Sequence, residues 1–80
     1  MKPKSMAQMG LSLLESAVIE LLEEVPEGLQ NVEVAERLDI HSEREGEQKD
    51  YLSWSILSLL MADGRVQKIG NKYIAAGARR

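Results

Sequence analysis

An uncharged apolar segment followed at once by a hairpin pattern constrains the fold of this chain more than any other feature. Residues 51–62 contain no charged side chain, and their apolar positions recur at helical spacing. Asp50 suits the start of a helix, and Gly64 suits its end because glycine adopts the left-handed conformation without a steric penalty. Residues 65–74 have Gly70-Asn71 near their centre, a pair that closes tight hairpins. The sequence therefore predicts a helix that stops before Gly64 and a β-hairpin after it.

This predicted helix, from Lys49 or Asp50 to Ala62, has two faces. The helical period directs four apolar residues to the core: Leu52, Ile56, Leu59 and Leu60. The other face then carries Ser53, Trp54, Leu57, Ser58 and Met61. For Trp54, partial burial against the preceding loop or helix is the favoured interpretation, because a small domain without phenylalanine needs its one tryptophan. Val66 and Tyr73 of the hairpin are expected to pack on this helix.

Two shorter helices are predicted before it. Ser12 and Glu15 form a Ser-x-x-Glu capping box, so the first helix is expected to begin at Ser12 and to end before Pro26. Its apolar stripe comprises Leu14, Val18, Leu21, Leu22 and Val25, widened by Ile19. Together with Leu11, part of this stripe also has coiled-coil spacing, but two heptads are short for a coiled coil, which favours core packing over dimerisation.

The second helix is expected over residues 32–38, with Asn31 as its cap. Val34, Ala35 and Leu38 then face inward, whereas the charged residues between them stay in water. The dipeptide Leu29-Gln30 is a candidate for an added strand of the hairpin sheet. Residues 39–49 are polar and predict a loop with Ile40 as an anchor.

Length and composition limit the function classes. Eighty residues make one small domain, for which we expect a flexible arm at 1–10, a folded unit at 11–76 and a tail at 77–80. The absence of cysteine excludes disulfides and thiolate zinc sites. Neither a secretory apolar segment nor an uninterrupted apolar run of membrane length is found, so a cytoplasmic protein without membrane contact is expected.

Charge is distributed unevenly along the chain, although its net value is only −3. Residues 11–47 contain eleven acidic and two basic side chains, whereas residues 48–80 contain two acidic and six basic ones. Glutamate-rich solvated helix faces would explain the acidic part without any function. An acidic rear would also disfavour contact with a polyanion everywhere except on the basic side, and this orienting effect favours a nucleic-acid partner.

Residues 12–75 resemble a winged helix-turn-helix DNA-binding domain of the kind found in small bacterial regulators and beside restriction-type nucleases. The resemblance rests on Trp54-x-Ile56-x-x-Leu59, then Gly64-Arg65-Val66, the hairpin and Tyr73-Ile74, together with Val34-Ala35-Glu36-Arg37-Leu38 in the preceding helix. It implies an α+β fold with three helices and a C-terminal β-hairpin wing. It also implies DNA binding in transcription regulation or restriction.

Seven residues are predicted to contact DNA in the third helix and the hairpin. The basic and amide side chains can bind phosphates, and the serine hydroxyl and tryptophan indole can contact a DNA groove. The seven residues are Lys49, Ser53, Trp54, Arg65, Lys68, Asn71 and Lys72. The hairpin lysines also have a simpler explanation, since lysine keeps exposed strand edges soluble.

Catalysis, metal binding and cofactor binding find little support in the sequence. His41 is the only histidine, and Glu20 and Glu24 belong to a helix surface in water. We therefore expect a protein that is not an enzyme and has no cofactor or metal. Double-stranded DNA is the expected partner, and a homodimer would suit a stand-alone regulator of this length. The alternative is a protein-interaction module that uses its acidic helices or a patch of Trp54, Leu57 and Met61.

Overall fold

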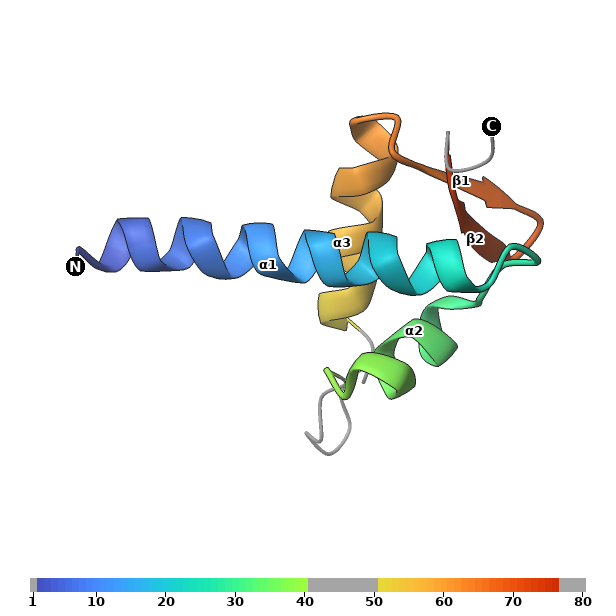
Figure 1. The fold of residues 1–80 in the computed structure, drawn as a ribbon, viewed down its shortest axis with the longest axis horizontal. Helices are drawn as coiled ribbons and strands as arrows, with labels where there is room; N and C mark the ends of the chain where they lie inside the picture. The colour runs from blue at the N-terminus through green and yellow to red at the C-terminus, as the bar shows by residue number, and fades with distance from the viewer. Residues whose placement is uncertain (1, 41–50, 77–80) are drawn as a thin grey trace.

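Within residues 2–40 and 51–76, which the computed structural model describes, three helices precede a two-stranded antiparallel hairpin (Figure 1). The elements are α1 Pro3–Glu24, α2 Asn31–Leu38, α3 Tyr51–Ala62, β1 Val66–Ile69 and β2 Lys72–Ala75. The predicted α+β class and the order of elements are confirmed. Most of the predicted loop at 39–49 lies outside the described residues.

Helix α1 begins at Pro3, so the predicted start at Ser12 was wrong. Proline fits the first helical position because its missing N–H would have no partner there, and Lys2 is the extended residue before it. The capping-box sequence at Ser12 instead lies inside the helix. Extending an existing helix is far easier than nucleating one, so residues 3–11, with several good helix formers, continue the helix that the core stabilises. The segment 1–10, expected as a flexible arm, is thus helical from Pro3.

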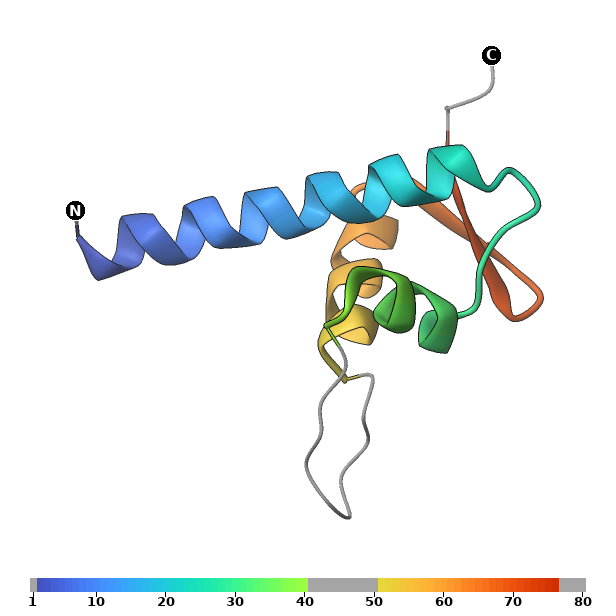
Figure 2. The same ribbon diagram turned by 60° about the horizontal axis from the view of Figure 1, so that its bottom comes forward.

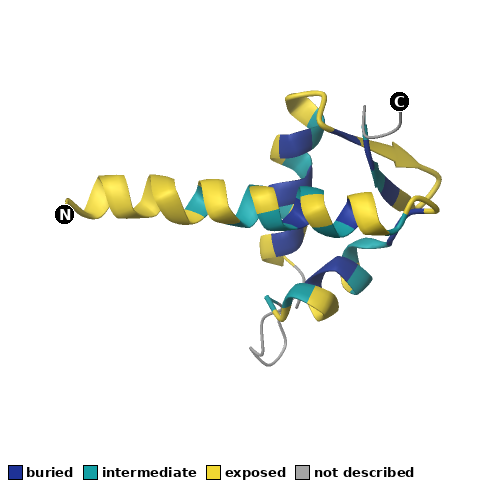
Figure 3. Cartoon of the chain, viewed as in Figure 1, coloured by how far each residue is buried: buried dark blue, intermediate teal, exposed yellow. Residues whose placement is uncertain are grey.

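The C-terminal half of α1 crosses α3 and the hairpin, whereas its N-terminal half projects away from the rest of the chain (Figures 1 and 2). The predicted apolar stripe packs as expected, because Val18 and Leu22 are buried and Leu14, Leu21 and Val25 pack against the core. Residues from every element complete this core: Leu29, Val34, Ala35, Ile56, Leu57, Leu60, Val66, Tyr73 and Ala75. Burial decreases along the helix toward its N-terminus: residues 2–10 are all exposed, and residues of intermediate exposure lie between them and the buried turns (Figure 3).

By length and composition alone, α1 could cross a membrane. Its most apolar 18-residue window has a mean hydropathy of 1.2, and only 11% of that window is buried. The sequence prediction counted uninterrupted apolar residues and therefore missed this helix. Length and composition are weak evidence for a membrane span, since a core helix passes the same test, and Val18 and Leu22 of α1 do belong to the core.

Helix α2 is capped by Gln30, and not by Asn31 as predicted. The Glu33 carboxylate accepts the Gln30 backbone N–H at 2.7 Å, and the two residues form a reciprocal capping box. Asn31 is consequently the first helical residue. Val34 and Ala35 are buried and Leu38 is partly buried, as predicted, and the helix ends at Leu38, followed by Asp39 in the left-handed conformation with a φ of 56°.

The hairpin turns at Gly70-Asn71, as predicted, with Lys68 opposite Tyr73 and Ile69 opposite Lys72. Gly70 has a φ of 64°, and Asn71 has no positive φ, which is the pattern of a type II′ turn. Leu29 adds a single bridge to the sheet, because its backbone exchanges hydrogen bonds of 3.1 and 2.7 Å with Tyr73. The suggested extra strand is therefore one residue long.

Helix α3 is rotated relative to the sequence prediction. Its buried residues are Ser53, Ile56, Leu57 and Leu60, an i, i+3, i+4, i+7 series. Leu52 and Leu59, expected in the core, are 44% and 47% exposed, and Ser53 and Leu57, expected on the outer face, are fully buried. The helix is apolar nearly all round, so several rotations bury a similar number of leucines. A serine could enter the core because the Ser53 hydroxyl donates a 2.6 Å hydrogen bond to Oδ1 of Asn31.

Candidate nucleic-acid interface

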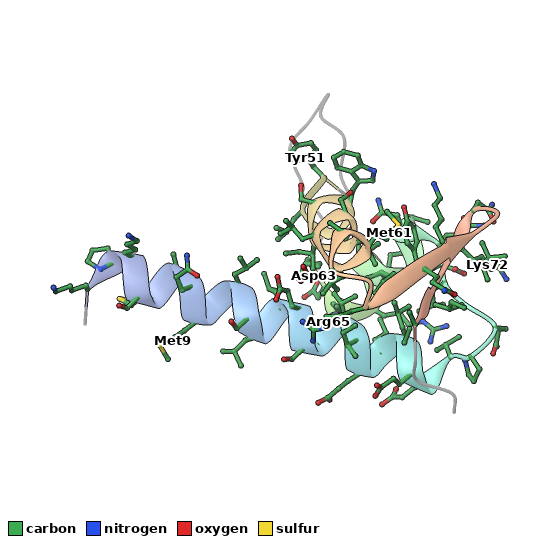
Figure 4. All side chains as sticks on the ribbon, turned by 90° about the horizontal axis from the view of Figure 1, so that it is seen from above. Met9, Tyr51, Met61, Asp63, Arg65 and Lys72 are labelled. Atoms are coloured by element: carbon green, nitrogen blue, oxygen red, sulfur yellow. The ribbon has the colours of Figure 1, made fainter. Side chains whose placement is uncertain are left out.

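The hairpin is a basic element with exposed polar side chains at its turn. Residues 64–76 contain three basic and no acidic side chains. Lys68, Asn71 and Lys72 are all exposed, and Figure 4 shows Lys72 at the end of the molecule opposite the N-terminus of α1. Ammonium and amide groups at a protruding turn can bind phosphate oxygens without reading the bases.

The two hairpin lysines lie on opposite faces of the sheet. The register places Lys68 beside Tyr73, and the Lys68 ammonium lies 5.5 Å from the centre of the Tyr73 ring. Lys72 pairs instead with Ile69, whose side chain is largely exposed. An end-on approach to the turn would bring a phosphate chain to both ammonium groups. The Tyr73 ring also attracts the Lys68 ammonium weakly, since a cation over an aromatic face is attracted to it.

Arg65 is directed toward α1 and is partly compensated there. Its guanidinium Nη1 lies 3.9 Å from a carboxylate oxygen of Glu15, and the Arg65 side chain is about half exposed. Such a long, partly exposed ion pair contributes little to stability. Arg65 therefore offers a phosphate less free charge than the lysines at the turn.

The accessible face of α3 is aromatic and apolar rather than charged. Trp54 and Tyr51 stack with ring centroids 6.0 Å apart and planes at 27°, and both are exposed. Leu52 and Leu59 lie on the same helix and are also exposed. No side chain of α3 is an arginine, lysine, asparagine or glutamine, the residues that make bidentate contacts with base edges. Trp54 was expected to be partly buried against the preceding loop or helix, but it is 48% exposed and stacks on Tyr51 of its own helix.

The structure changes the predicted contact set. Ser53 has no exposed surface and binds Asn31, so its assignment to a DNA-binding surface is withdrawn. Helical periodicity could not reveal this burial, because the partner Asn31 lies on another helix and their pairing depends on tertiary structure. Lys49 lies outside the described residues. The hairpin brings together Lys68, Asn71 and Lys72, whereas Trp54 and Arg65 are presented by separate parts of the surface.

Other kinds of site find no support in the described part of the chain. Among residues 2–40 and 51–76, no group of three or more histidine, aspartate or glutamate side chains could hold a metal ion. His41, the one histidine, lies outside these ranges.

Comparison of the chain with protein-family models, with curated proteins and with solved structures gave no match. Functional inference consequently rests on the residues and their arrangement. Two features carry it: the basic hairpin, and the exposed apolar side chains on the helices.

Proposed function

We propose that this chain is a winged-helix DNA-binding module of a transcriptional regulator or a restriction-related protein, with the β1–β2 hairpin as its wing. The observation that carries the proposal is the exposed, acid-free hairpin with Lys68, Asn71 and Lys72, directly after α3. The order of three helices and a hairpin is also that of a winged helix. In such domains a helix and a wing meet the groove and the adjacent backbone.

In this proposal the wing supplies phosphate contacts, and α3 supplies few base contacts. Lys68 and Lys72 neutralise phosphates, and Asn71 donates its amide hydrogens to phosphate oxygens. On α3, which lies on a part of the surface separate from the wing, Trp54 and the partly exposed residues Ser55 and Ser58 are the groups offered to the duplex. Because α3 has no charged or amide side chain, binding is expected to depend strongly on salt and weakly on base sequence.

Charge on the remaining surface orients the encounter. Exposed carboxylates lie on α1, on α2 and between them: Glu20, Glu23, Glu24, Glu27 and Glu36. These carboxylates repel a polyanion, so the electrostatic potential of the protein favours encounters in which the wing faces the DNA. The same carboxylates lower the overall affinity, which makes a weak binder the expected outcome for a single copy of the chain.

The proposal is tested by titrating the isotope-labelled protein with a mixed-sequence duplex while amide shifts are followed. At about 50 mM salt we expect shifts in the hairpin and α3, and weaker binding at about 200 mM, because each neutralised phosphate adds about 0.9 to the log–log salt slope. Changing Lys68 and Lys72 together to alanine is expected to lower the affinity and to reduce that slope by about 2.

Lys4→Glu is the matched control for this double variant. It changes the net charge by the same amount at an exposed position of α1, far along the chain from the wing. If the wing mediates binding, the Lys4→Glu variant should bind DNA with nearly the same log–log salt slope as wild type. Equal losses in both variants would mean that only net charge matters, and an absence of shifts at low salt would reject DNA binding.

One observation favours a second candidate, a winged-helix protein-interaction module. Tyr51 and Trp54 form an exposed stacked pair on an uncharged helix, Leu52 and Leu59 are exposed on another side of it, and exposed apolar patches mark interaction sites. The patch differs from the predicted one, because Leu57 is buried. If duplex DNA produces no amide shifts, binding of a protein partner should be compared between wild type and the Trp54→Lys variant.

A further inference from the structure

The projecting half of α1 exposes an apolar face that the chain itself does not cover. Met6, Met9 and Leu13 are 56%, 52% and 70% exposed. Figure 3 shows this half exposed on every turn, and Figure 4 shows Met9 directed away from the helix into solvent. The face lies on the opposite side of the helix from the stripe that packs in the core.

The three apolar residues belong to a longer series with the spacing of a helix–helix contact. Steps of four and three residues alternate along the series Lys2, Met6, Met9, Leu13, Ser16 and Glu20. All six side chains are exposed. The series is basic at its N-terminal end, apolar in its middle and acidic at its C-terminal end. This polarity makes the face complementary to a reversed copy of itself.

We propose that this face binds the same face of a second copy of the chain, with the two α1 helices antiparallel. Met9 of each copy then lies against Leu13 of the other, and Met6 lies against Ser16. Lys2 of each copy meets Glu20 of the other, so the two-fold axis repeats each ion pair. Parallel helices would instead place Lys2 against Lys2 and Glu20 against Glu20, and like charges repel.

Short length does not prevent this pairing, although an isolated coiled coil of two to three heptads would be marginal. The C-terminal half of α1 is already held in the core by Val18 and Leu22, so the cost of nucleating the helix is met within each folded chain. The projecting half continues the same helix, so association requires no new helix nucleation. Because three apolar side chains per copy form a small contact, we expect a weak dimer at micromolar to millimolar concentrations.

The charge pattern favours a second copy over a membrane surface. Helices that lie on membranes combine an apolar face with lysine and arginine, which attract anionic lipids. The face on α1 ends in Glu20, its spacing leads next to Glu23, and Glu24 lies beside it. These carboxylates would oppose contact with anionic lipid, whereas Glu20 would pair with Lys2 of a second copy.

Sedimentation of the whole chain over a range of concentrations up to about 1 mM tests the proposal, since a contact weaker than that would be negligible. Wild type is expected to dimerise reversibly. Leu13→Glu is expected to raise the dimer Kd at least about tenfold, because it places two charges in the apolar centre. Gln8→Glu makes the same charge change at an exposed position on another side of the helix and should leave the Kd close to wild type. Far-UV circular dichroism checks that both variants remain folded.

Charge reversal tests the antiparallel direction. Lys2→Glu and Glu20→Lys should each weaken association about three- to tenfold, because the symmetry turns two attractive pairs into two repulsive ones. Combining both changes in one chain should restore the dimer affinity. Parallel pairing predicts no loss in either single variant, and that result would overturn the proposed geometry.

Three other results would overturn the proposal itself. The first is a monomer at every concentration, and the second is self-association that Leu13→Glu does not weaken. The third is a monomer that binds vesicles of anionic and zwitterionic lipid through Leu13, which would assign the face to a membrane. DNA binding is measured separately, because Leu13→Glu leaves the wing intact. A failure of dimerisation is therefore distinguishable from a failure of DNA binding.

Discussion

The two halves of α1 form one continuous helix but have opposite surroundings. In the C-terminal half, Val18 and Leu22 are fully buried between α3 and the hairpin. In the N-terminal half, Met6, Met9 and Leu13 are exposed, and the helix projects beyond the other elements (Figure 1). Both halves are helical, so backbone structure alone does not report which of them stabilises the fold. The difference lies in packing, and substitutions of the same residue type in each half can measure it.

Leucine-to-alanine changes should show the largest contrast between the halves. Leu22→Ala removes a side chain that is 1% exposed, and we expect it to lower the free energy of unfolding by about 2–5 kcal/mol through lost burial and a residual cavity. Leu13→Ala, at 70% exposure, should change it by no more than about 0.5 kcal/mol. Urea denaturation of dilute protein, where self-association does not contribute, measures both. Similar losses in both variants would show that the projecting half is packed in solution.

Glycine-to-alanine changes should differ in sign. Gly28, in the turn after α1, has a φ of 96°, and a Cβ there would lie 3.0 Å from Ile74 Cγ2 and 3.2 Å from the Tyr73 carbonyl oxygen. Gly28→Ala should therefore lower the free energy of unfolding by about 2 kcal/mol or more.

Gly10→Ala is the counterpart in the projecting half of α1, where nothing lies within 4 Å of an added Cβ. Alanine there should raise the free energy of unfolding by at most about 0.5–1 kcal/mol, because it reduces the entropy lost on helix formation. Thermal or urea unfolding compares the pair. A stabilising Gly28→Ala would contradict the close approach of this turn to β2.

Serine-to-alanine changes should give the smallest contrast. Ser53→Ala removes the 2.6 Å hydrogen bond to Asn31 that joins α3 to α2, and we expect a loss of about 1 kcal/mol in the free energy of unfolding. Ser12→Ala changes an exposed serine of α1 and should be neutral or stabilising by about 0.5 kcal/mol, because alanine has the higher helix propensity. If Ser53→Ala is also neutral, the hydrogen bond has no net value in the core.

The elements that could be predicted are those for which local chemistry allows one solution. Gly70-Asn71 indicated the position of the hairpin turn, and Pro26 indicated that α1 ends before it. The buried pair Val34 and Ala35 followed from helical spacing within a charged helix. In each case the neighbouring residues in the sequence contain the information, because turn geometry and an amphipathic period are local properties.

The elements that differ from the prediction are those for which several arrangements satisfy the local rules equally well. For α2, both Gln30 and Asn31 precede a helical segment, and the reciprocal bond with Glu33 selects Gln30. For α1, the capping-box sequence at Ser12 competes with continued helix, and continuation is observed. The candidate site likewise contains residues that could be predicted and residues that could not. The exposed hairpin lysines could be predicted, whereas Ser53 could not be assigned to the interior.

The order of elements, the hairpin turn and the segregation of charge can be read from the chain, since they depend on residues close together in it. The rotation of α3 instead depends on tertiary packing, because a helix that is apolar nearly all round has no unique inward face until its neighbours are in place. The same holds for the two sides of α1. Two stripes run along it with helical spacing, and the placement of α3 and the hairpin buries one and leaves Met6, Met9 and Leu13 in solvent. Which of two apolar surfaces becomes core is a property of what packs against them.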